Sequence, residues 1–278
     1  MNVLLRAIGA EFLKVLTTRT WWVLAIVMAA YVALLAGGLG GLFGYISAHP
    51  EAARGGSGGG LPPGTAVQQL IYGFATTIGY VFPVLLGALA TTGEFRHQTL
   101  TPTFLATPRR GLVLLAKVKV FFLVGAVFGV IAWAASLTAG GLVLGAVGLE
   151  SQLGHPDVWA EAGRGILAMA LWSAIGVGLG ALVRSQVAAI VIVLAFTQFV
   201  EPLLRLAAGF IDATAAIGRF LPGAASDALV GSSFYSIAGT GGGASDPLSW
   251  WAGALVLLAY AVLFTVAGYF TSWRRDVS

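Results

Sequence analysis

Long apolar stretches alternate with short polar segments along the whole chain. A helix needs about 20 apolar residues to cross the hydrocarbon core of a bilayer, and six stretches reach or come near that length. We therefore predict an all-α integral membrane protein with six transmembrane helices, in which residues 1–278 form a single transmembrane domain. The predicted spans are Trp21–Phe43, Leu70–Ala90, Val118–Val147, Ile166–Val183, Val187–Val200 and Trp250–Thr271.

Two of the predicted spans depart from the usual length. The third is long for one crossing, so we expect it to tilt or to end in a short extracellular helix. The fifth is short, and it either continues past Glu201–Pro202 or re-enters the membrane. Residues 201–249 then contain a partly apolar run punctuated by proline. This run predicts one or two short helices at the outer membrane surface or dipping into it.

The first residues follow a different pattern. In residues 2–18, apolar side chains recur at helical spacing, whereas Glu11 and Lys14 lie elsewhere around the helix. The apolar set is Leu5, Ile8, Phe12, Val15 and Leu16. Such a segment is typical of an interfacial amphipathic helix leading into the first span. No apolar core precedes its charged residues, so we expect no signal peptide and expect the first span to remain as an anchor.

Composition supports a membrane protein and narrows its chemistry. Charged residues make up 9% of the chain, against about 25% in soluble domains. Hydrophobic residues make up 58%, and the mean hydropathy is +0.90. The chain has no cysteine, which excludes disulfides, cysteine-based zinc sites and thiol catalysis. Its three histidines are far apart and form no metal-binding motif, so we predict no metal site.

Charged residues are divided unequally between the two sides that six spans create. The termini and the segments after the second and fourth spans carry 11 of the 15 basic residues and three acids. The opposite segments carry four basic residues and eight acids, and they include the glycine-rich linker around residues 55–60. Cytoplasmic loops are enriched in Lys and Arg. We therefore predict that both termini are cytoplasmic.

The sequence lacks the residues that are characteristic of several classes of function. A P-loop requires a lysine that follows glycine, and none of the three lysines does. We therefore expect any ATP to be bound by another protein. The predicted spans carry no charged residue deep in their middle, and neither broken helices nor inverted repeats are evident, which disfavours a secondary transporter. No embedded catalytic set is visible.

A charged, proline-bounded segment, GEFRHQTLTPTFLATPRR at positions 93–110, separates the second and third spans. Together with the N-terminal helix and the TTRTWW sequence that follows it, this segment resembles the membrane subunit of ABC transporters of the type-2 exporter class, in the form common in high-GC Gram-positive bacteria. The loop residues that carry the resemblance are Glu94, Thr99, Leu105, Pro108, Arg109, Arg110 and Lys117. The chain departs from the family at Gln98, where glycine is common, and at Phe104, where leucine is frequent.

The resemblance implies that Glu94–Leu105 forms a coupling helix, which docks in a cleft of a separate ATPase subunit. We expect Glu94 near the start of that helix, where a carboxylate suits the positive end of the helix dipole. Pro102 is expected to shorten or kink the helix, and Pro108 to end it.

The same segment combines apolar and basic side chains. Its apolar residues Phe95, Leu100, Phe104 and Leu105 are expected to enter a partner groove. Its arginines could pair with acids of the ATPase or with lipid headgroups. A basic cytoplasmic loop without a partner would explain the arginines, but it needs no apolar or proline pattern. The candidate coupling residues are Glu94, Phe95, Arg96, Thr99, Pro102, Phe104, Leu105, Pro108, Arg109 and Arg110.

The resemblance further implies a permease subunit of the bacterial plasma membrane that exports an amphipathic or hydrophobic substrate, such as a drug, antibiotic or lipid. It implies no enzymatic activity of its own. The implied partners are two ATPase subunits that bind ATP and Mg, a second identical or paralogous permease copy, and membrane lipid, but no nucleic acid. The alternatives are a non-transporting scaffold or sensor subunit that works with an ATPase and, less favoured, a secondary transporter or channel.

Aromatic and hydroxyl side chains on the second and fifth predicted spans suit amphipathic cargo. Ordinary helix packing explains each of them at least as well. The candidate substrate-path residues are Tyr72, Thr76, Tyr80, Phe82, Phe196, Gln198 and Phe199.

Overall fold

The computed structural model describes residues 3–49, 67–210, 216–232 and 248–274. Within these ranges the chain is helical and contains no strand, which confirms the all-α prediction. The elements are α1 (Val3–Thr17), α2 (Thr20–Ala48), α4 (Val67–Thr77), α5 (Val81–Arg96), α6 (Leu100–Ala106), α7 (Arg110–Ala146), α8 (Pro156–Val183), α9 (Gln186–Ala195), the π-helical turn η1 (Phe196–Val200), α10 (Glu201–Phe210), α12 (Pro222–Val230), α14 (Trp250–Gly268) and the π-helical turn η2 (Tyr269–Trp273). The glycine-rich linker around 55–60 lies outside the described residues.

Six helical segments are long and apolar enough to cross a membrane, which agrees with the predicted number of spans. They are Thr20–Ile46, Val67–Arg96, Arg110–Ala146, Pro156–Val183, Gln186–Ala207 and Trp250–Trp273. The third and fourth begin eight or more residues before their predicted starts, because a helix can continue into charged sequence once it has left the hydrocarbon. At a rise of about 1.5 Å per residue, the 37 residues of α7 extend about 55 Å.

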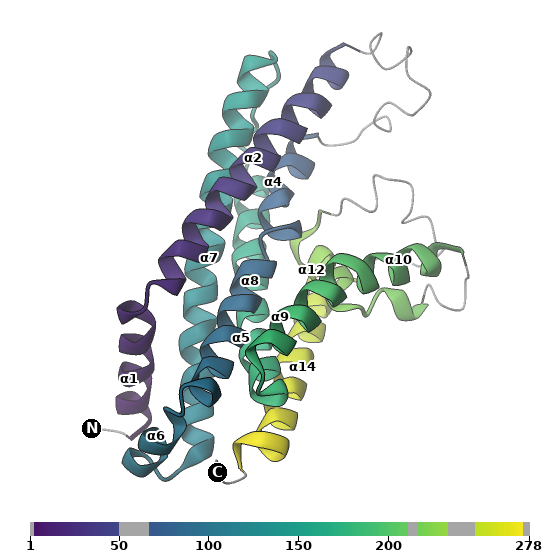
Figure 1. The fold of residues 1–278 in the computed structure, drawn as a ribbon. Helices are drawn as coiled ribbons and strands as arrows, with labels where there is room; N and C mark the ends of the chain where they lie inside the picture. The colour runs from purple at the N-terminus through teal and green to yellow at the C-terminus, as the bar shows by residue number, and fades with distance from the viewer. Residues whose placement is uncertain (1–2, 50–66, 211–215, 233–247, 275–278) are drawn as a thin grey trace.

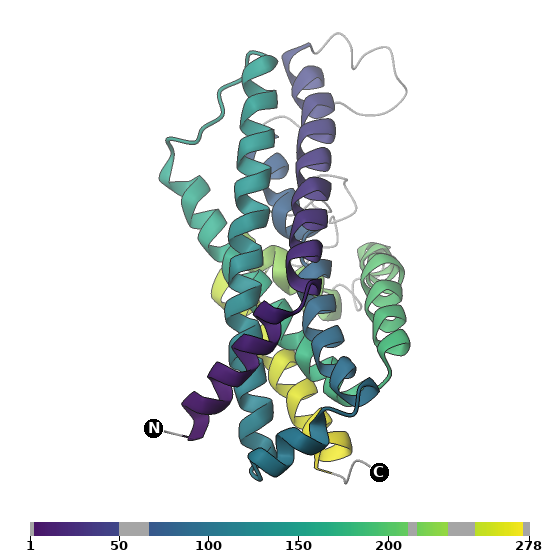
Figure 2. The same ribbon diagram turned by 60° about the vertical axis from the view of Figure 1, so that its left-hand side comes forward.

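Helix α8 forms the centre of the bundle and packs against α5, α7 and α14 (Figures 1 and 2). In its most apolar 18-residue window, 72% of the residues are buried. Two glycines allow the backbones of α5 and α8 to touch. A Cβ atom at Gly176 would lie 2.1 Å from the carbonyl oxygen of Val84, and one at Gly87 would lie 2.4 Å from that of Ser173. Any larger residue at either position would push the two helices apart.

Three of the other spans keep wide apolar faces exposed. In the spans Gln186–Ala207 and Trp250–Trp273 only 22% of the most apolar 18-residue window is buried, and in Thr20–Ile46 only 28%. Leu34 on α2, Val187 on α9 and Leu263 on α14 are each more than half exposed. Faces of this size are typical of helices that contact lipid or a further protein subunit.

The second span is interrupted, which corrects the expectation that no span would be broken. Helix α4 ends at Thr77 and α5 begins at Val81. A Cβ atom at Gly79 would lie 2.1 Å from the carbonyl oxygen of Ala75, so the tight turn requires glycine there. Pro83 lies in the first turn of α5, where its missing N–H costs no hydrogen bond.

The fifth span takes the first of its two predicted courses and continues past Glu201–Pro202 through η1 into α10. Helix α12 packs against α14 and α8. Arg205 of α10 joins the two short helices, because its guanidinium contacts Glu201 at 3.2 Å and Asp227 of α12 at 2.8 Å. Within residues 201–249, α10 therefore continues the fifth span and α12 is a separate short helix, and an ion pair links the two.

Both described ends of the chain lie at the same end of the bundle as α6, as Figure 2 shows. Helix α1 runs obliquely to α2 and exposes apolar side chains, among them Leu5, Leu13 and Leu16. This geometry agrees with six crossings and an amphipathic N-terminal helix.

Candidate functional site

Four charged side chains from three helices meet at the α6 end of the bundle. Glu11 and Lys14 come from α1, Glu94 from α5 and Lys117 from α7. The Nζ atom of Lys117 lies 2.5 Å from Oε2 of Glu11 and 3.1 Å from Oε1 of Glu94. The Nζ atom of Lys14 lies 2.6 Å from Oε1 of Glu11 and 2.7 Å from Oε1 of Glu94. We call these four residues the charge cluster.

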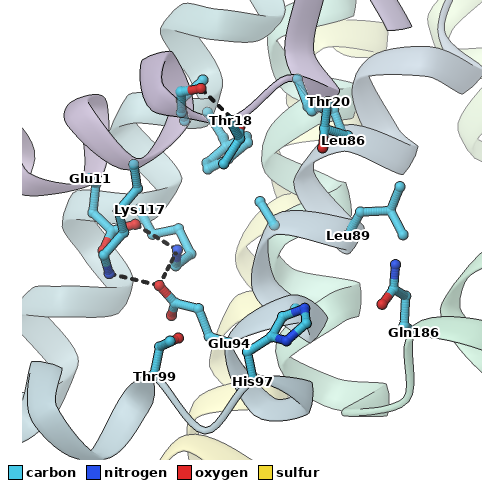
Figure 3. A pocket seen from close by; sticks show the side chains of 15 residues that line it. Glu11, Thr18, Thr20, Leu86, Leu89, Glu94, His97, Thr99, Lys117 and Gln186 are labelled. Atoms are coloured by element: carbon cyan, nitrogen blue, oxygen red, sulfur yellow. Dashed lines mark hydrogen bonds and ion pairs between the residues drawn. The ribbon is translucent and has the colours of Figure 1, made fainter. Parts of the chain in front are cut away.

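Figure 3 shows Glu11, Lys117 and Glu94 of this cluster pointing toward one another. The side chains of Lys117, Glu11 and Glu94 are 2%, 3% and 7% exposed, whereas that of Lys14 is 40% exposed. Two carboxylates and two ammonium groups balance in formal charge. A lone charge at this depth would carry a desolvation cost of several kcal/mol, so each residue depends on the others, and the cluster ties α1 and α5 to α7.

The protonation behaviour of α1 follows from this geometry. Burial acts to raise the pKa of Glu11, but Lys117 and Lys14 outweigh it and hold that pKa below the ordinary value of 4.5. Burial likewise acts to lower the pKa of Lys14, and the carboxylates of Glu94 and Glu11 raise it above 10.5. Both groups are therefore charged over the whole neutral range.

The position of Glu94 differs from the one expected. It lies in the last turn of α5 rather than at the start of a coupling helix, so its charge is stabilised by lysines and not by a helix dipole. The i, i+3 spacing of Glu11 and Lys14 indicates from the sequence alone that they share a helix face. Their partners Glu94 and Lys117 lie some 80 and 106 residues away along the chain, and no local pattern links residues so far apart.

The predicted coupling segment divides into the end of α5, a turn and the short helix α6. Gln98 in the turn has φ of 53°, in the left-handed region that favours glycine. This is the position at which the resembled family commonly has glycine. Pro102 lies in the first turn of α6, where no backbone N–H partner is needed, so it neither kinks nor shortens the helix. The helix ends at Ala106, before Pro108, as predicted.

An aromatic contact fixes this segment to the C-terminal end of the chain. The Trp273 ring lies 5.7 Å from the rings of both Phe95 and Phe104, in edge-to-face geometry with each. Its Nε1 donates to the carbonyl oxygen of Arg110 at 3.0 Å. The guanidinium of Arg110 in turn lies 5.0 Å from the centre of the Phe104 ring. We call Phe95, Phe104 and Trp273 the aromatic clamp.

The clamp changes the roles expected for the apolar residues. Phe95 and Phe104 are partly buried within this chain, so they hold the segment in place rather than project toward a partner. Leu100, also expected to meet a partner, is fully buried, and of the four expected apolar residues only Leu105, at 80% exposed, projects outward. Thr99 precedes α6 and is exposed.

The arginines at this end of the bundle contact neighbouring elements. Arg96 donates to Oε1 of Gln186, at the start of α9, at 3.0 Å. Arg110 donates to the carbonyl oxygen of Arg274 at 2.9 Å. Arg184, one of the 11 basic residues on the predicted cytoplasmic side, donates to the carbonyl oxygen of Ser272 at 3.0 Å. These bonds connect the segments around α6, α9 and η2, and Arg109 is exposed beside them.

The candidate substrate-path residues do not share one surface. Tyr72 is fully buried and donates to the carbonyl oxygen of Ser151. Thr76 is buried and accepts from Trp133 Nε1 at 3.1 Å. Tyr80 stacks on Trp172 with ring centres 4.5 Å apart. By contrast, Gln198 and Phe199 are exposed, and Phe82 and Phe196 are half-buried.

Glu161 is a buried acid that the span assignments placed outside the membrane. The fourth span begins at Pro156, so Glu161 lies within it, with 3% of its surface exposed. Neither of its oxygens has a hydrogen-bond partner among the described residues. A Cβ atom at Gly73 would lie 3.7 Å from Glu161 Oε1, so the carboxyl faces α4. Glu161 lies in the second turn of this span, so the expectation that no span carries a charged residue deep in its middle stays a prediction.

No protein-family model matches this chain, and no curated protein sequence matches it. Among the described residues, no three His, Asp or Glu side chains come together in a way that could hold a metal ion. The functional argument therefore rests on the architecture and on the residues at the α6 end of the bundle.

Proposed function

We propose that this chain is the membrane-spanning subunit of an ATP-driven exporter. In this proposal α6 is the docking element for a separate ATPase subunit, which binds ATP and Mg. Two copies of the chain, or one copy and a paralogue, associate in a bacterial plasma membrane with both termini in the cytoplasm. The cargo is amphipathic or hydrophobic, because the spans expose broad apolar faces and few polar groups.

The single observation that supports the proposal is the way in which α6 is attached to the neighbouring helices. A seven-residue helix exposes Leu105 at 80% while its two ends are held by other elements. The charge cluster fixes the preceding helix α5 to α1 and α7, and the aromatic clamp fixes α6 to the end of the sixth span. A surface helix that is attached at both ends can transmit a movement of a bound partner to the helices to which it is attached.

Leu105→Asp tests this docking role. We expect the variant to insert and fold normally, because Leu105 makes little contact within the chain. We expect its association with the co-expressed ATPase in mild detergent to fall about tenfold or more, as for the loss of an apolar hot-spot side chain. Leu142→Asp is the matched control, since Leu142 is 76% exposed near the opposite end of α7. Equal co-purification of the ATPase with both variants would refute the docking role.

The buried Glu161 favours one alternative, an ion-coupled carrier, because unpaired buried acids serve as proton or ion sites in such proteins. Transport assays in vesicles separate the two functions. An exporter of the proposed kind moves cargo only with ATP and its ATPase. Transport by the chain alone, driven by an imposed proton gradient, would establish the carrier instead. A non-transporting scaffold would bind the ATPase and move no cargo in either assay.

A further inference from the structure

The fifth span packs against the bundle along one narrow stripe. In α9 and η1 the buried side chains are those of Ala189, Val193 and Thr197, which recur at every fourth residue. This stripe faces the rest of the bundle, where α9 contacts α5 and α8. Figure 1 shows the segment continuing into α10 at one side of the bundle. Its other faces therefore remain available to lipid or to a further protein subunit.

Gln198 is exposed on this span, close to its middle. It lies about 18 Å from the start of the 22-residue span Gln186–Ala207, at the rise per residue of a helix. This depth is near the centre of a hydrocarbon core about 30 Å thick. An exposed amide at that depth meets acyl chains, which offer neither a hydrogen-bond donor nor an acceptor.

The amide of Gln198 is only partly satisfied within the chain. Its Nε2 donates to the hydroxyl of Thr197 at 3.4 Å, which is long for a hydrogen bond. No described residue donates to its Oε1. Unsatisfied polar groups are costly in hydrocarbon, and Gln side chains in membrane proteins form hydrogen bonds between helices. We therefore expect another helix to supply a donor and an acceptor at this position.

The residues around Gln198 suit the close approach of a second helix. Val191, Leu194, Ala195 and Gln198 are exposed and recur at spacings of three and four residues, so they share one side of the helix. We call these four residues the α9 face. Ala195 leaves room beside the amide, because small residues allow helix backbones to approach each other in lipid. Helix α9 and η1 contain no charged residue, so two copies of the face can meet without electrostatic repulsion.

A second copy of this chain complements the α9 face directly. One Gln side chain contains both a donor and an acceptor, and near a two-fold axis each residue lies opposite the same residue of the partner. Two copies with the same orientation in one membrane are related by an axis perpendicular to that membrane, so their α9 helices run side by side. We propose that two copies of this chain associate through the α9 face, with the two Gln198 amides hydrogen-bonded across the axis. The inference rests on the proposed function only for the presence of a second copy, and it names the surface through which the copies meet.

Because the chain has no cysteine, a single introduced thiol can form a disulfide only with another molecule. Leu194→Cys and, independently, Val191→Cys each place one thiol on the α9 face of the full-length protein. In native membranes treated with copper phenanthroline, we expect both variants to form a covalent dimer. Leu263→Cys is the matched control and should stay monomeric, since Leu263 is 59% exposed on α14, near the middle of the sixth span.

Variants of Gln198 test the amide itself. In the Leu194→Cys background, Gln198→Leu should lower the yield of covalent dimer about threefold to tenfold, the usual effect of losing a hydrogen bond between transmembrane helices. Gln198→Asn keeps a donor and an acceptor, so it should retain more of the dimer than Gln198→Leu does. An unchanged yield in Gln198→Leu would overturn the role of the amide.

Other occupants of the α9 face give different results. Crosslinking of Leu263→Cys alone would show that the copies meet through α14, and equal crosslinking at all three positions would indicate random collision. No crosslinking at Leu194→Cys or Val191→Cys would mean that lipid or a different protein covers the face. Each of these results would overturn the proposal.

Co-purification of the ATPase with the same variants is measured in parallel. Normal co-purification without crosslinking on the α9 face would reject this interface and leave the proposed docking of α6 standing. Crosslinking on the α9 face without any co-purified ATPase would support the interface and count against the exporter function. The two failures are therefore distinguishable.

Discussion

At the residue scale, Lys117 is the most constrained charge in the α6 end of the bundle. It is 2% exposed and contacts both Glu11 and Glu94, so its removal leaves two buried carboxylates sharing Lys14. We expect Lys117→Met to lower the free energy of unfolding by about 3–5 kcal/mol, the usual effect of breaking a buried ion pair from one side. Thermal melting in detergent measures this effect.

Lys119→Met provides the control, since Lys119 lies two residues further along α7 and is exposed. Its melting temperature should stay near that of the wild type. Adding Glu11→Gln to Lys117→Met should recover part of the loss, because it removes one of the two uncompensated carboxylates. Equal destabilisation by both lysine variants would contradict the role assigned to Lys117.

The same cluster predicts how stability depends on pH. The folded pKa of Glu11 is lowered, so its stabilising contribution is present above about pH 4.5 and is lost as the pH falls through the folded pKa. The folded pKa of Lys14 is raised, so its contribution is present below about pH 10.5 and is lost as the pH rises through the folded pKa. The contribution of the cluster to the melting temperature should therefore not change with pH between these limits. Glu11→Gln should flatten the acid limb, and an unchanged acid limb would argue against this assignment.

At the element scale, the aromatic clamp determines whether α6 is held rigidly. Trp273→Ala removes both edge-to-face contacts and the bond to the carbonyl oxygen of Arg110. We expect a loss of about 3–5 kcal/mol, as for other buried tryptophans, and faster amide hydrogen exchange across residues 97–109. For the proposed exporter, we expect ATP hydrolysis to continue while transport declines.

Trp251→Ala is the appropriate comparison for this variant. Trp251 lies in α14, the helix that leads into η2, but it is 56% exposed and belongs to its opposite end. Exchange at α6 should be unchanged in Trp251→Ala. If Trp273→Ala left exchange at α6 unchanged as well, the clamp would not be what fixes the helix.

The elements differ in how far the sequence predicts them. Apolar runs located all six spans because hydrocarbon thickness sets their length. The apolar pattern does not reveal the break at Gly79, because Gly79 and Pro83 lie within an otherwise continuous apolar run. The inward position of Phe95 and Phe104 depends on Trp273, which arrives from the other end of the chain. Periodicity reports only which face of one helix is apolar, and it carries no information about which distant side chain covers that face.

At the scale of the whole molecule, the unequal distribution of charged residues predicts how the bundle is oriented in the membrane. The end that holds both described chain ends and α6 also holds the arginines around it, including Arg96, Arg110 and Arg184. The positive-inside rule predicts that this end faces the cytoplasm, and the proposed docking of α6 to an ATPase requires that orientation. Orientation is therefore a condition that the proposed function must satisfy.

The absence of cysteine from the chain makes orientation directly measurable. Thr101→Cys places one thiol on the exposed surface of α6, and His155→Cys places one at the exposed start of α8, at the other end of the bundle. In intact cells, a membrane-impermeant maleimide should label His155→Cys and leave Thr101→Cys unlabelled until the membrane is opened. The reverse pattern would place α6 outside the cell, beyond the reach of any cytoplasmic ATPase, and would exclude the exporter function whatever the stability of the charge cluster.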